Sequence, residues 1–315
     1  MNMNLVIFGG TFDPIHNGHI RISEAASKKL NASLIFVPAK SPRWKNPEET
    51  SNQRLEMLKC ALLHVNFKYE ICDYELLSNA EVNYSIYTVN YLVKKHSNDK
   101  LFFLIGADEV NAFPKWKDAK KLSELVKIIY SDRPEMELNN KIIKDYNMES
   151  IDFLESGEVS STAIKEMKSI DLPFEVLKYI EDNRLYFVKK LSNYLPIERL
   201  NHSIEVANLT LKVAQVNNLI PIEKYYFAAL FHDLGKTYHK DDENIKNLMK
   251  EYYPEYLDIP NFAYHQFIGE FLAKRDFGIN DTEILDAIKY HCTGKANMTV
   301  LGMMVYACDK IEPTR

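Results

Sequence analysis

The 315-residue sequence is poor in cysteine and has no long apolar run. Its four cysteines (Cys60, Cys72, Cys292 and Cys308) are scattered without a CxxC pair, which favours reduced thiols. No stretch approaches the ~18 consecutive apolar residues of a membrane-spanning helix, and the N-terminal apolar run is too short for a signal peptide. We therefore expect a cytoplasmic protein with no membrane partner.

The sequence also lacks an excess of basic residues. Lysine and arginine number 39 against 44 acidic residues, and the net charge is −5 without a basic stripe. This balance argues against broad nucleic-acid binding, whereas a locally positive site can still hold a small anion. The chain is too long for one ordinary core and is expected to form two domains.

Short apolar runs alternate with amphipathic stretches through the first part of the chain. This alternation predicts parallel strands joined by crossover helices, hence an open α/β sheet whose ligands bind at the carboxyl ends of the strands. The expected strands are 5–8, 33–38, 68–72, 101–106 and 126–131, and the expected helices are 18–30, 51–65, 84–96 and 117–125. With 172–187 as its closing segment, this domain is placed at residues 1–189. Only helical periodicity follows, so residues 190–315 are predicted to form an all-α domain.

The segment IFGGTFDPIHNGH at residues 7–19 joins the first expected strand to a helix. Gly9 and Gly10 let the backbone approach a ligand closely, because no Cβ intervenes. The following helix start offers N–H groups and the positive end of a dipole, which suit an anion. His16 and His19 stand three residues apart and therefore face the same side of that helix start. The residues alone predict a phosphate site.

This segment resembles the GxFDxxHxGH signature of the nucleotidylyltransferase superfamily, and VSSTAIKEM at 159–167 resembles its second signature. The resemblance implies a Rossmann-like fold in which His16 and His19 contact ATP phosphates and stabilise the charge of the transition state. It implies that ATP binding also involves Gly9, Gly10, Thr11, Phe12, Asp13, Ser160, Ser161 and Thr162. Lys165 stands where the family commonly has arginine, and it keeps the charge but loses the bidentate fork.

Segments 36–45, 85–92 and 104–122 further resemble nicotinate mononucleotide adenylyltransferases. The site residues that they imply are Lys45, Tyr87, Thr88, Gly106, Asp108 and Trp116. Asp108 would hold a ribose hydroxyl, and Trp116 would offer an aromatic face to the nicotinate ring. The resemblance implies that AMP passes from ATP to nicotinate mononucleotide, with Mg²⁺ and with Lys45 and Lys165 among the catalytic groups. Since no protein nucleophile is needed, positioning and charge stabilisation supply the catalysis.

The second predicted domain carries the sequence AALFHDLGK, in which His232 and Asp233 stand side by side on an otherwise apolar helix. Adjacent buried polar groups are costly unless something such as a metal pairs with them. The remaining candidate ligands on helical segments are His202, His265, His291 and Asp309. This constellation resembles the HD-domain phosphohydrolases, which implies that His202, His232, Asp233 and Asp309 hold a first metal, iron, manganese or another transition metal. The resemblance gives His265 and His291 a role at a second metal or at a substrate phosphate.

Four segments, RLNHSIEVA, FHDLGK, IKYHCTGK and ACDKIEPTR, further resemble the symmetrical dinucleoside-tetraphosphatases. That resemblance implies hydrolysis of diadenosine tetraphosphate to two ADP molecules. The implied nucleotide contacts are His202, Lys236, His265, His291, Cys292, Asp309 and Arg315. Members of this group usually continue for another few dozen residues beyond the position of Arg315.

The leading hypothesis is therefore a bifunctional enzyme, and two alternatives stay open. In the first, the acceptor is pantetheine phosphate or a cytidylyl acceptor, and the second domain hydrolyses another nucleotide or a cyclic dinucleotide. In the second, one half is a nucleotide-sensing regulatory module. The sequence also leaves a homo-oligomer open.

Overall fold

The computed structural model describes residues 2–42, 46–133, 136–154, 159–238 and 242–313. The chain forms two compact units, Met1–Asp182 and Asn183–Arg315. The boundary expected from the sequence, after residue 189, falls inside helix α10 (Tyr186–Ser192). Phe187 of this helix packs its ring against Tyr226 and Phe227, so its apolar side chains contribute to the second core.

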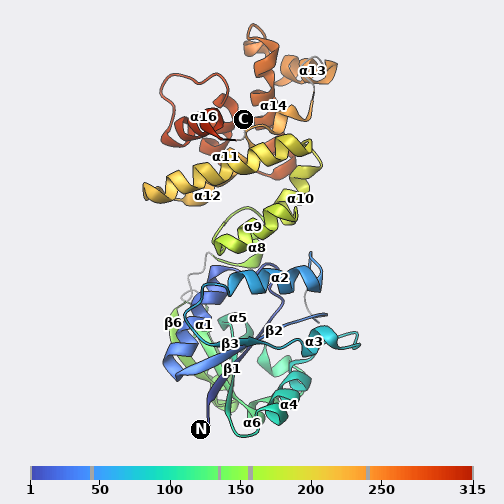
Figure 1. Cartoon of the computed structure of the whole chain (residues 1–315), viewed down its shortest axis with the longest axis vertical. Coiled ribbons are helices and arrows are strands. Elements are labelled where there is room, and N and C mark those ends of the chain that lie inside the picture. Colours follow the sequence, from blue (N-terminus) through green and yellow to red (C-terminus); the bar gives the residue numbers. More distant parts are fainter. Residues whose placement is uncertain (1, 43–45, 134–135, 155–158, 239–241, 314–315) are drawn as a thin grey trace. The chain divides into compact units, whose positions relative to one another are not determined.

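The first unit is built on a six-stranded sheet whose strand pairs are all parallel (Figure 1). Its strands are β1 (Asn4–Gly10), β2 (Ala32–Pro38), β3 (Tyr69–Ile71), β4 (Lys100–Ile105), β5 (Lys127–Asp132) and β6 (Glu149–Leu154). Their order across the sheet is β3-β2-β1-β4-β5-β6. The direction of winding reverses between β1 and β4, which places the ligand crevice at the carboxyl ends of these two strands. The expected α/β fold is confirmed.

Helices connect and cover these strands. They are α1 (Asn17–Leu30), α2 (Ser51–Ala61), α3 (Tyr74–Leu77), α4 (Ser85–Lys95), α5 (Ala107–Val110), the 3₁₀ turn η1 (Phe113–Lys115), α6 (Ala119–Leu125), α7 (Asn140–Asp145), α8 (Ser161–Lys165) and α9 (Phe174–Asp182). The four helices expected between the strands correspond to α1, α2, α4 and α6. The central strands are continuous apolar runs because both faces are covered, and Val6 and Ile7 of β1 are fully buried.

Strand β6 is the one element of the sheet that the sequence did not predict. It lies at the edge of the sheet beside β5. Ser150 and Asp152 alternate with apolar residues in it, whereas β1, β2, β4 and β5 contain the continuous apolar runs by which they were recognised. An edge strand needs less apolar surface, because only one neighbour covers its side.

The second unit is helical, as expected, and its described residues contain no strand. After α10 its elements are α11 (Ile197–Val216), α12 (Ile222–Phe231), η2 (Leu234–Thr237), α13 (Glu243–Tyr252), η3 (Pro254–Tyr256), η4 (Asn261–Ala263), α14 (Tyr264–Phe277), α15 (Thr282–Tyr290) and α16 (Val300–Ile311). Every residue of α12 from Tyr225 to Phe231 is buried, so this helix lies inside the unit. No helix in the described part of the chain is both long and apolar enough to cross a bilayer.

Candidate active sites

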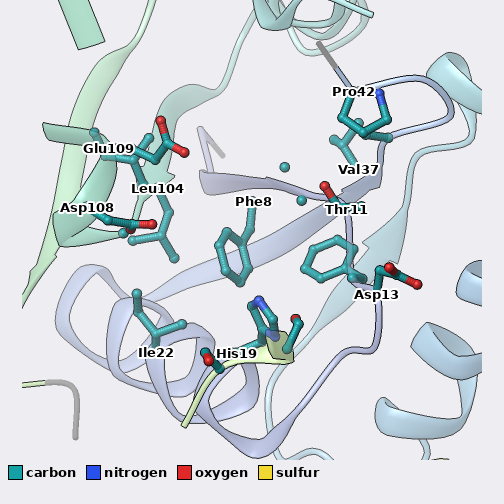
Figure 2. A pocket seen from close by; sticks show the side chains of 18 of the residues that line it. Phe8, Thr11, Asp13, His19, Ile22, Val37, Pro42, Leu104, Asp108 and Glu109 are labelled. Carbon is teal, nitrogen blue, oxygen red and sulfur yellow. The ribbon is translucent and has the colours of Figure 1, made fainter. Parts of the chain in front are cut away.

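A cavity of about 740 Å³ lies at the carboxyl ends of β1 and β4 in the first unit. It is also bordered by the first residues of α1, α4 and α8, and Figure 2 shows Phe8, His19 and Asp108 around it. The residues from the sequence prediction that line it are Gly9, Gly10, Thr11, Phe12, Asp13, His16, His19, Gly106, Asp108, Trp116, Ser160, Ser161, Thr162 and Lys165. The fold thus brings both signatures to one place.

The backbone turn after β1 is tight. Phe12 adopts a φ of 50°, a left-handed conformation that costs about 1 kcal/mol or more in a residue other than glycine. A Cβ added to Gly10 would lie 2.7 Å from the Phe12 ring. The edge of that ring meets the ring of His19, with 5.3 Å between centroids. Gly10 is therefore needed for Phe12 to fold back against the histidine.

The two histidines of the first signature lie against one another at the start of α1. Their ring centroids are 3.8 Å apart. The backbone N–H of His16 donates to Nδ1 of His19 at 3.2 Å. Because Nδ1 accepts this bond, the ring proton of His19 resides on Nε2, which makes that nitrogen a donor suited to phosphate oxygens.

Asp13 joins three segments of the site. Its carboxylate is buried and accepts a bond from Nζ of Lys165 at 3.0 Å. It also accepts from the backbone N–H groups of Glu48 at 2.9 Å and Glu49 at 3.3 Å. Figure 2 shows this carboxylate turned away from His19. These contacts support a role for Asp13 in holding the two signatures together.

The second signature begins helix α8 beside the first. Oγ of Ser160 accepts from the backbone N–H of Ala163 at 3.0 Å and caps the helix. The hydroxyl of Ser161 donates to the carbonyl of Pro14 at 2.9 Å. All three side chains line the cavity, and those of Ser160 and Ser161 also hold the loop together.

Arg54 of α2 supports the same loops, and the sequence analysis did not single it out. It is 1% exposed, and its guanidinium donates to the carbonyls of Thr11, Ala39, Lys40 and Glu49 at 2.6, 2.7, 3.3 and 3.2 Å. A charged residue on the inner face of a predicted helix is the sequence signal that could have found it.

Only some of the residues expected to contact nicotinate mononucleotide line the cavity. Trp116 lines the cavity, and its Nε1 donates to Glu109 at 3.3 Å. Tyr87 and Thr88 are not among the lining residues; Tyr87 accepts a bond from Lys117 at 2.6 Å, and Thr88 is buried.

The lining comes instead from Tyr84 and Ser85 at the start of α4. The sequence signal was the helix start, because α4 belongs to the connection between the parallel strands β3 and β4 and a helix of such a connection starts near the carboxyl edge of the sheet. Lys45 lies outside the described residues.

A buried carboxyl also reaches this cavity. Glu75 of α3 is 7% exposed and accepts a bond from the hydroxyl of Thr88 at 2.6 Å. Burial raises the pKa of the Glu75 carboxyl above its usual value, although the bond from Thr88 opposes this rise.

The second unit gathers six predicted side chains from five segments. They are His202 of α11, His232 and Asp233 after α12, His265 of α14, His291 after α15 and Asp309 of α16. All except His202 are buried, and the side chain of His202 is 11% exposed. Two overlapping groups of potential metal ligands result, one of His202, His232 and Asp309 and the other of His232, Asp233 and His291.

The ring orientation of these histidines is set by their Nδ1 atoms. Nδ1 of His232 lies 2.7 Å from the carbonyl of Ala229, and the Nδ1 atoms of His265 and His291 make equivalent contacts at 2.7 and 2.8 Å. Because a carbonyl only accepts, each Nδ1 carries the proton and each Nε2 presents a lone pair. Burial lowers the pKa of His291 to about 4, so this ring is a neutral ligand at neutral pH.

The Nε2 atoms converge on two carboxylate oxygens. Oδ1 of Asp233 lies 3.6 Å from Nε2 of His232, 3.4 Å from that of His265 and 3.5 Å from that of His291. Oδ1 of Asp309 lies 3.1 Å from Nε2 of His202 and 3.6 Å from that of His232. These are the separations expected between atoms that share an ion at bond lengths of about 2.1 Å.

Two observations show that this donor set fits a metal. Within the described residues, the buried Nε2 of His232 and Oδ1 of Asp233 make no hydrogen bond. Nε2 of His265 lies 3.1 Å from Nε2 of His291, and two lone pairs at this distance need a cation or a proton between them. Mixed imidazole and carboxylate ligands suit a divalent transition metal.

Close packing of η2 against α14 brings Asp233 and His265 together. A Cβ added to Gly235 would lie 1.9 Å from the carbonyl oxygen of His265 and 2.7 Å from the backbone nitrogen of Gly269. Only glycine allows this approach.

The other three residues predicted to contact the nucleotide in the second unit differ in where they lie. Lys236 pairs with Oδ2 of Asp233 at 2.8 Å, so it lies beside the cluster. Cys292 is half-buried, burial raises the pKa of its thiol, and its backbone N–H donates to Gln266 at 3.1 Å. Arg315 lies outside the described residues.

Comparison with protein families agrees with this division of the chain. Residues 7–167 match the family model described as cytidylyltransferase-like, and residues 199–314 match the HD domain.

Two relatives extend over nearly the whole chain. A Mycoplasma genitalium protein named as a probable nicotinate-nucleotide adenylyltransferase/Ap4A hydrolase is 32% identical over 100% of this chain and 89% of its own. A Mycoplasma pneumoniae protein of the same name is 29% identical over 98% of this chain and 89% of its own. A solved structure of Plasmodium falciparum nicotinic acid mononucleotide adenylyltransferase superposes with a TM-score of 0.50 at 19% identity, covering 59% of this chain and 98% of that one. The last likeness shows the fold of the first unit.

Proposed function

The chain belongs to the family of the Mycoplasma nicotinate-nucleotide adenylyltransferase/Ap4A hydrolases, and from this premise we propose that it is a bifunctional enzyme. The first unit transfers AMP from ATP to nicotinate mononucleotide. The second unit hydrolyses diadenosine tetraphosphate to two ADP molecules.

The first activity is supported by the convergence of the two signatures on one cavity. Lys165 meets Asp13, and Ser161 meets Pro14, beside the paired rings of His16 and His19. In the reaction, a phosphate oxygen of nicotinate mononucleotide attacks the α-phosphorus of ATP, and the bond to the β-phosphate oxygen breaks to release pyrophosphate. His19 donates from Nε2 to the phosphates, and His16 and Lys165 stabilise the negative charge that develops on the leaving pyrophosphate. The nucleotide phosphates would bring Mg²⁺ to the site.

The test of this activity is pyrophosphate release from ATP and nicotinate mononucleotide. His19→Ala is expected to lower kcat by about 10²–10³-fold, the usual effect of removing one charge-stabilising donor. A panel with nicotinamide mononucleotide and pantetheine phosphate identifies the acceptor, and CTP in place of ATP identifies the donor. Turnover confined to another pair would contradict the proposal.

The second activity is supported by the convergence of the His and Asp side chains on a shared centre. His202, His232, Asp233 and Asp309 would hold a transition metal, with His265 and His291 beside it at a second ion or at a substrate phosphate. When bound, such a metal lowers the pKa of a water so that hydroxide is available to a phosphorus centre. Lys236 stands at the edge of the cluster with a charge that suits phosphate.

The test of the second activity is ADP release from diadenosine tetraphosphate with Mn²⁺ or Fe²⁺ supplied. Asp233→Asn is expected to abolish it, because this carboxylate oxygen lies within 3.6 Å of three imidazole nitrogens. Binding of the dinucleotide without turnover by the wild-type chain would instead indicate a nucleotide-sensing module. Release of AMP and ATP would indicate an asymmetrical hydrolase.

A further inference from the structure

Glu312 is a buried carboxylate next to the proposed metal ligands, and no role has been given to it above. It is 3% exposed and follows the last residue of α16. Its Oε2 lies 3.2 Å from Nδ1 of His202, while Nε2 of the same ring lies 3.1 Å from Oδ1 of Asp309. His202 is thus held between two carboxylates, one at each ring nitrogen.

The need for this carboxylate follows from the position of His202 in its helix. His232 and His291 follow the last residues of α12 and α15, where carbonyls of the final turn are available to accept from Nδ1. Nδ1 of His265, in the first turn of α14, contacts the carbonyl of Phe262 before the helix.

His202 stands inside α11 (Ile197–Val216), where backbone carbonyls already accept helical N–H groups. An acceptor for its Nδ1–H must come from another segment, and Glu312 supplies it.

We propose that Glu312 is the positioning residue of His202. It accepts the Nδ1 proton, which fixes the tautomer whose Nε2 lone pair faces the metal, and its negative charge makes that lone pair a stronger donor. This inference rests on the proposed metal site of the second unit. It adds a carboxylate–histidine pair to that site. Glu312 then acts by orienting a metal ligand, without touching the substrate.

Metal affinity is the direct measurement. The full chain is stripped with a chelator, dialysed and titrated with Mn²⁺, and free Mn²⁺ is followed by its electron paramagnetic resonance spectrum. Glu312→Leu is expected to weaken Mn²⁺ binding about 10–100-fold, the usual cost of removing an outer-shell partner. Glu312→Gln keeps an acceptor but loses the charge, so its affinity is expected to fall between those of Glu312→Leu and the wild type.

Two controls separate positioning from general damage. Glu283→Gln removes a carboxylate of the same unit that pairs with Lys224, and it is expected to leave Mn²⁺ affinity unchanged. The ring tautomer is read independently by ¹⁵N NMR of the metal-free histidines, at a pH high enough for the His202 ring, which lies between two carboxylates, to be neutral. The Nδ1–H form of His202 is expected to persist in Glu312→Gln and to be lost in Glu312→Leu.

The outcomes distinguish this inference from the proposed function. If the wild type binds Mn²⁺ and Glu312→Leu binds it equally well, the role of Glu312 is overturned while the metal site stands. If the wild type binds no Mn²⁺, Fe²⁺ or Zn²⁺, both are overturned. Weaker binding by Glu312→Leu with an unchanged His202 tautomer would also overturn it, because the effect would then be structural.

Discussion

Arg54 shows how a single buried charge can organise a loop. Its guanidinium donates to four backbone carbonyls, those of Thr11, Ala39, Lys40 and Glu49. Because Arg54 donates to the carbonyl of Thr11 in the turn after β1, it fixes the peptide planes beside the proposed phosphate site. Arg54 therefore acts by holding the backbone in place. Its replacement is expected to lower the free energy of unfolding.

We predict that Arg54→Met destabilises the protein by about 3 kcal/mol, because buried carbonyls lose their donor. The free energy of unfolding is measured in urea with circular dichroism. Arg21→Met is the matched control, since the Arg21 side chain is 43% exposed and its pair with Asp171 is worth less than about 1 kcal/mol. Equal losses in the two variants would contradict this account of Arg54.

At the scale of elements, the contact between α3 and α4 contains a titrating group. Burial raises the pKa of Glu75 above 4.5, with the hydrogen bond from Thr88 acting against it. The folded protein therefore holds this proton more tightly than the unfolded chain does. Glu75 contributes stability below pH 4.5, and this contribution is lost as the pH rises through the folded-state pKa.

Glu75→Gln is consequently predicted to raise the melting temperature by an amount that grows with pH. The difference from the wild type should be small near pH 5, larger at pH 7 and constant above the folded-state pKa of Glu75. Melting temperatures at a series of pH values measure it. Glu81→Gln, at an exposed position, provides the control. A difference that shrinks toward neutral pH would show that the carboxylate is stabilised in the fold.

The packing of η2 against α14 leads to a prediction for Gly235→Ala. The new Cβ would meet backbone atoms of His265 and Gly269, which a rotamer change cannot relieve. We expect a loss of about 1–3 kcal/mol in unfolding free energy and much weaker Mn²⁺ binding, because His265 moves away from Asp233. Gly302→Ala is the control, since the nearest neighbours of its Cβ are side-chain atoms of Met298 and Thr299. Unchanged Mn²⁺ affinity in Gly235→Ala would contradict the expected displacement.

The elements also show what a single sequence can reveal. Continuous apolar runs such as β1 are recognisable because burial on both faces removes polar positions. The pairing of strand β6 depends on its neighbour β5, and short-range patterns in the sequence do not contain this neighbour. The same holds for the partners of Arg54 and Glu312, which lie on other segments of the chain. The histidines were recognisable because chemistry restricts which residues can hold a phosphate or a metal.

At the scale of the molecule, the two units are expected to differ in metal requirement. Mg²⁺ prefers oxygen ligands and phosphates, whereas the imidazole-rich cluster suits a transition metal. After chelation and dialysis, Mg²⁺ alone should restore pyrophosphate release but not ADP release, and added Mn²⁺ or Fe²⁺ should restore ADP release. Both products are measured on one preparation. Full recovery of both activities with Mg²⁺ alone would contradict the assignment.

Each unit supplies its own site from its own residues. The lining of the first cavity runs from Phe8 to Lys165, and the second cluster runs from His202 to Asp309. Since no described residue of one site is drawn from the other unit, inactivation of one is predicted to leave the other intact. His19→Ala should lower pyrophosphate release about 10²–10³-fold with ADP release unchanged. His232→Ala should abolish ADP release with pyrophosphate release unchanged, because its Nε2 belongs to both ligand groups.

Each variant serves as the folding control for the other, since the intact activity reports a native chain. Rates are compared at saturating substrate with both metals present. A weaker affinity for substrate or metal is then not mistaken for a lower kcat. If either variant changes the rate of the remote reaction by about fivefold or more, the sites are energetically coupled. If the two rates are independent, neither reaction requires the other site. Any advantage of carrying both activities on one chain would then come from how their substrates and products are used.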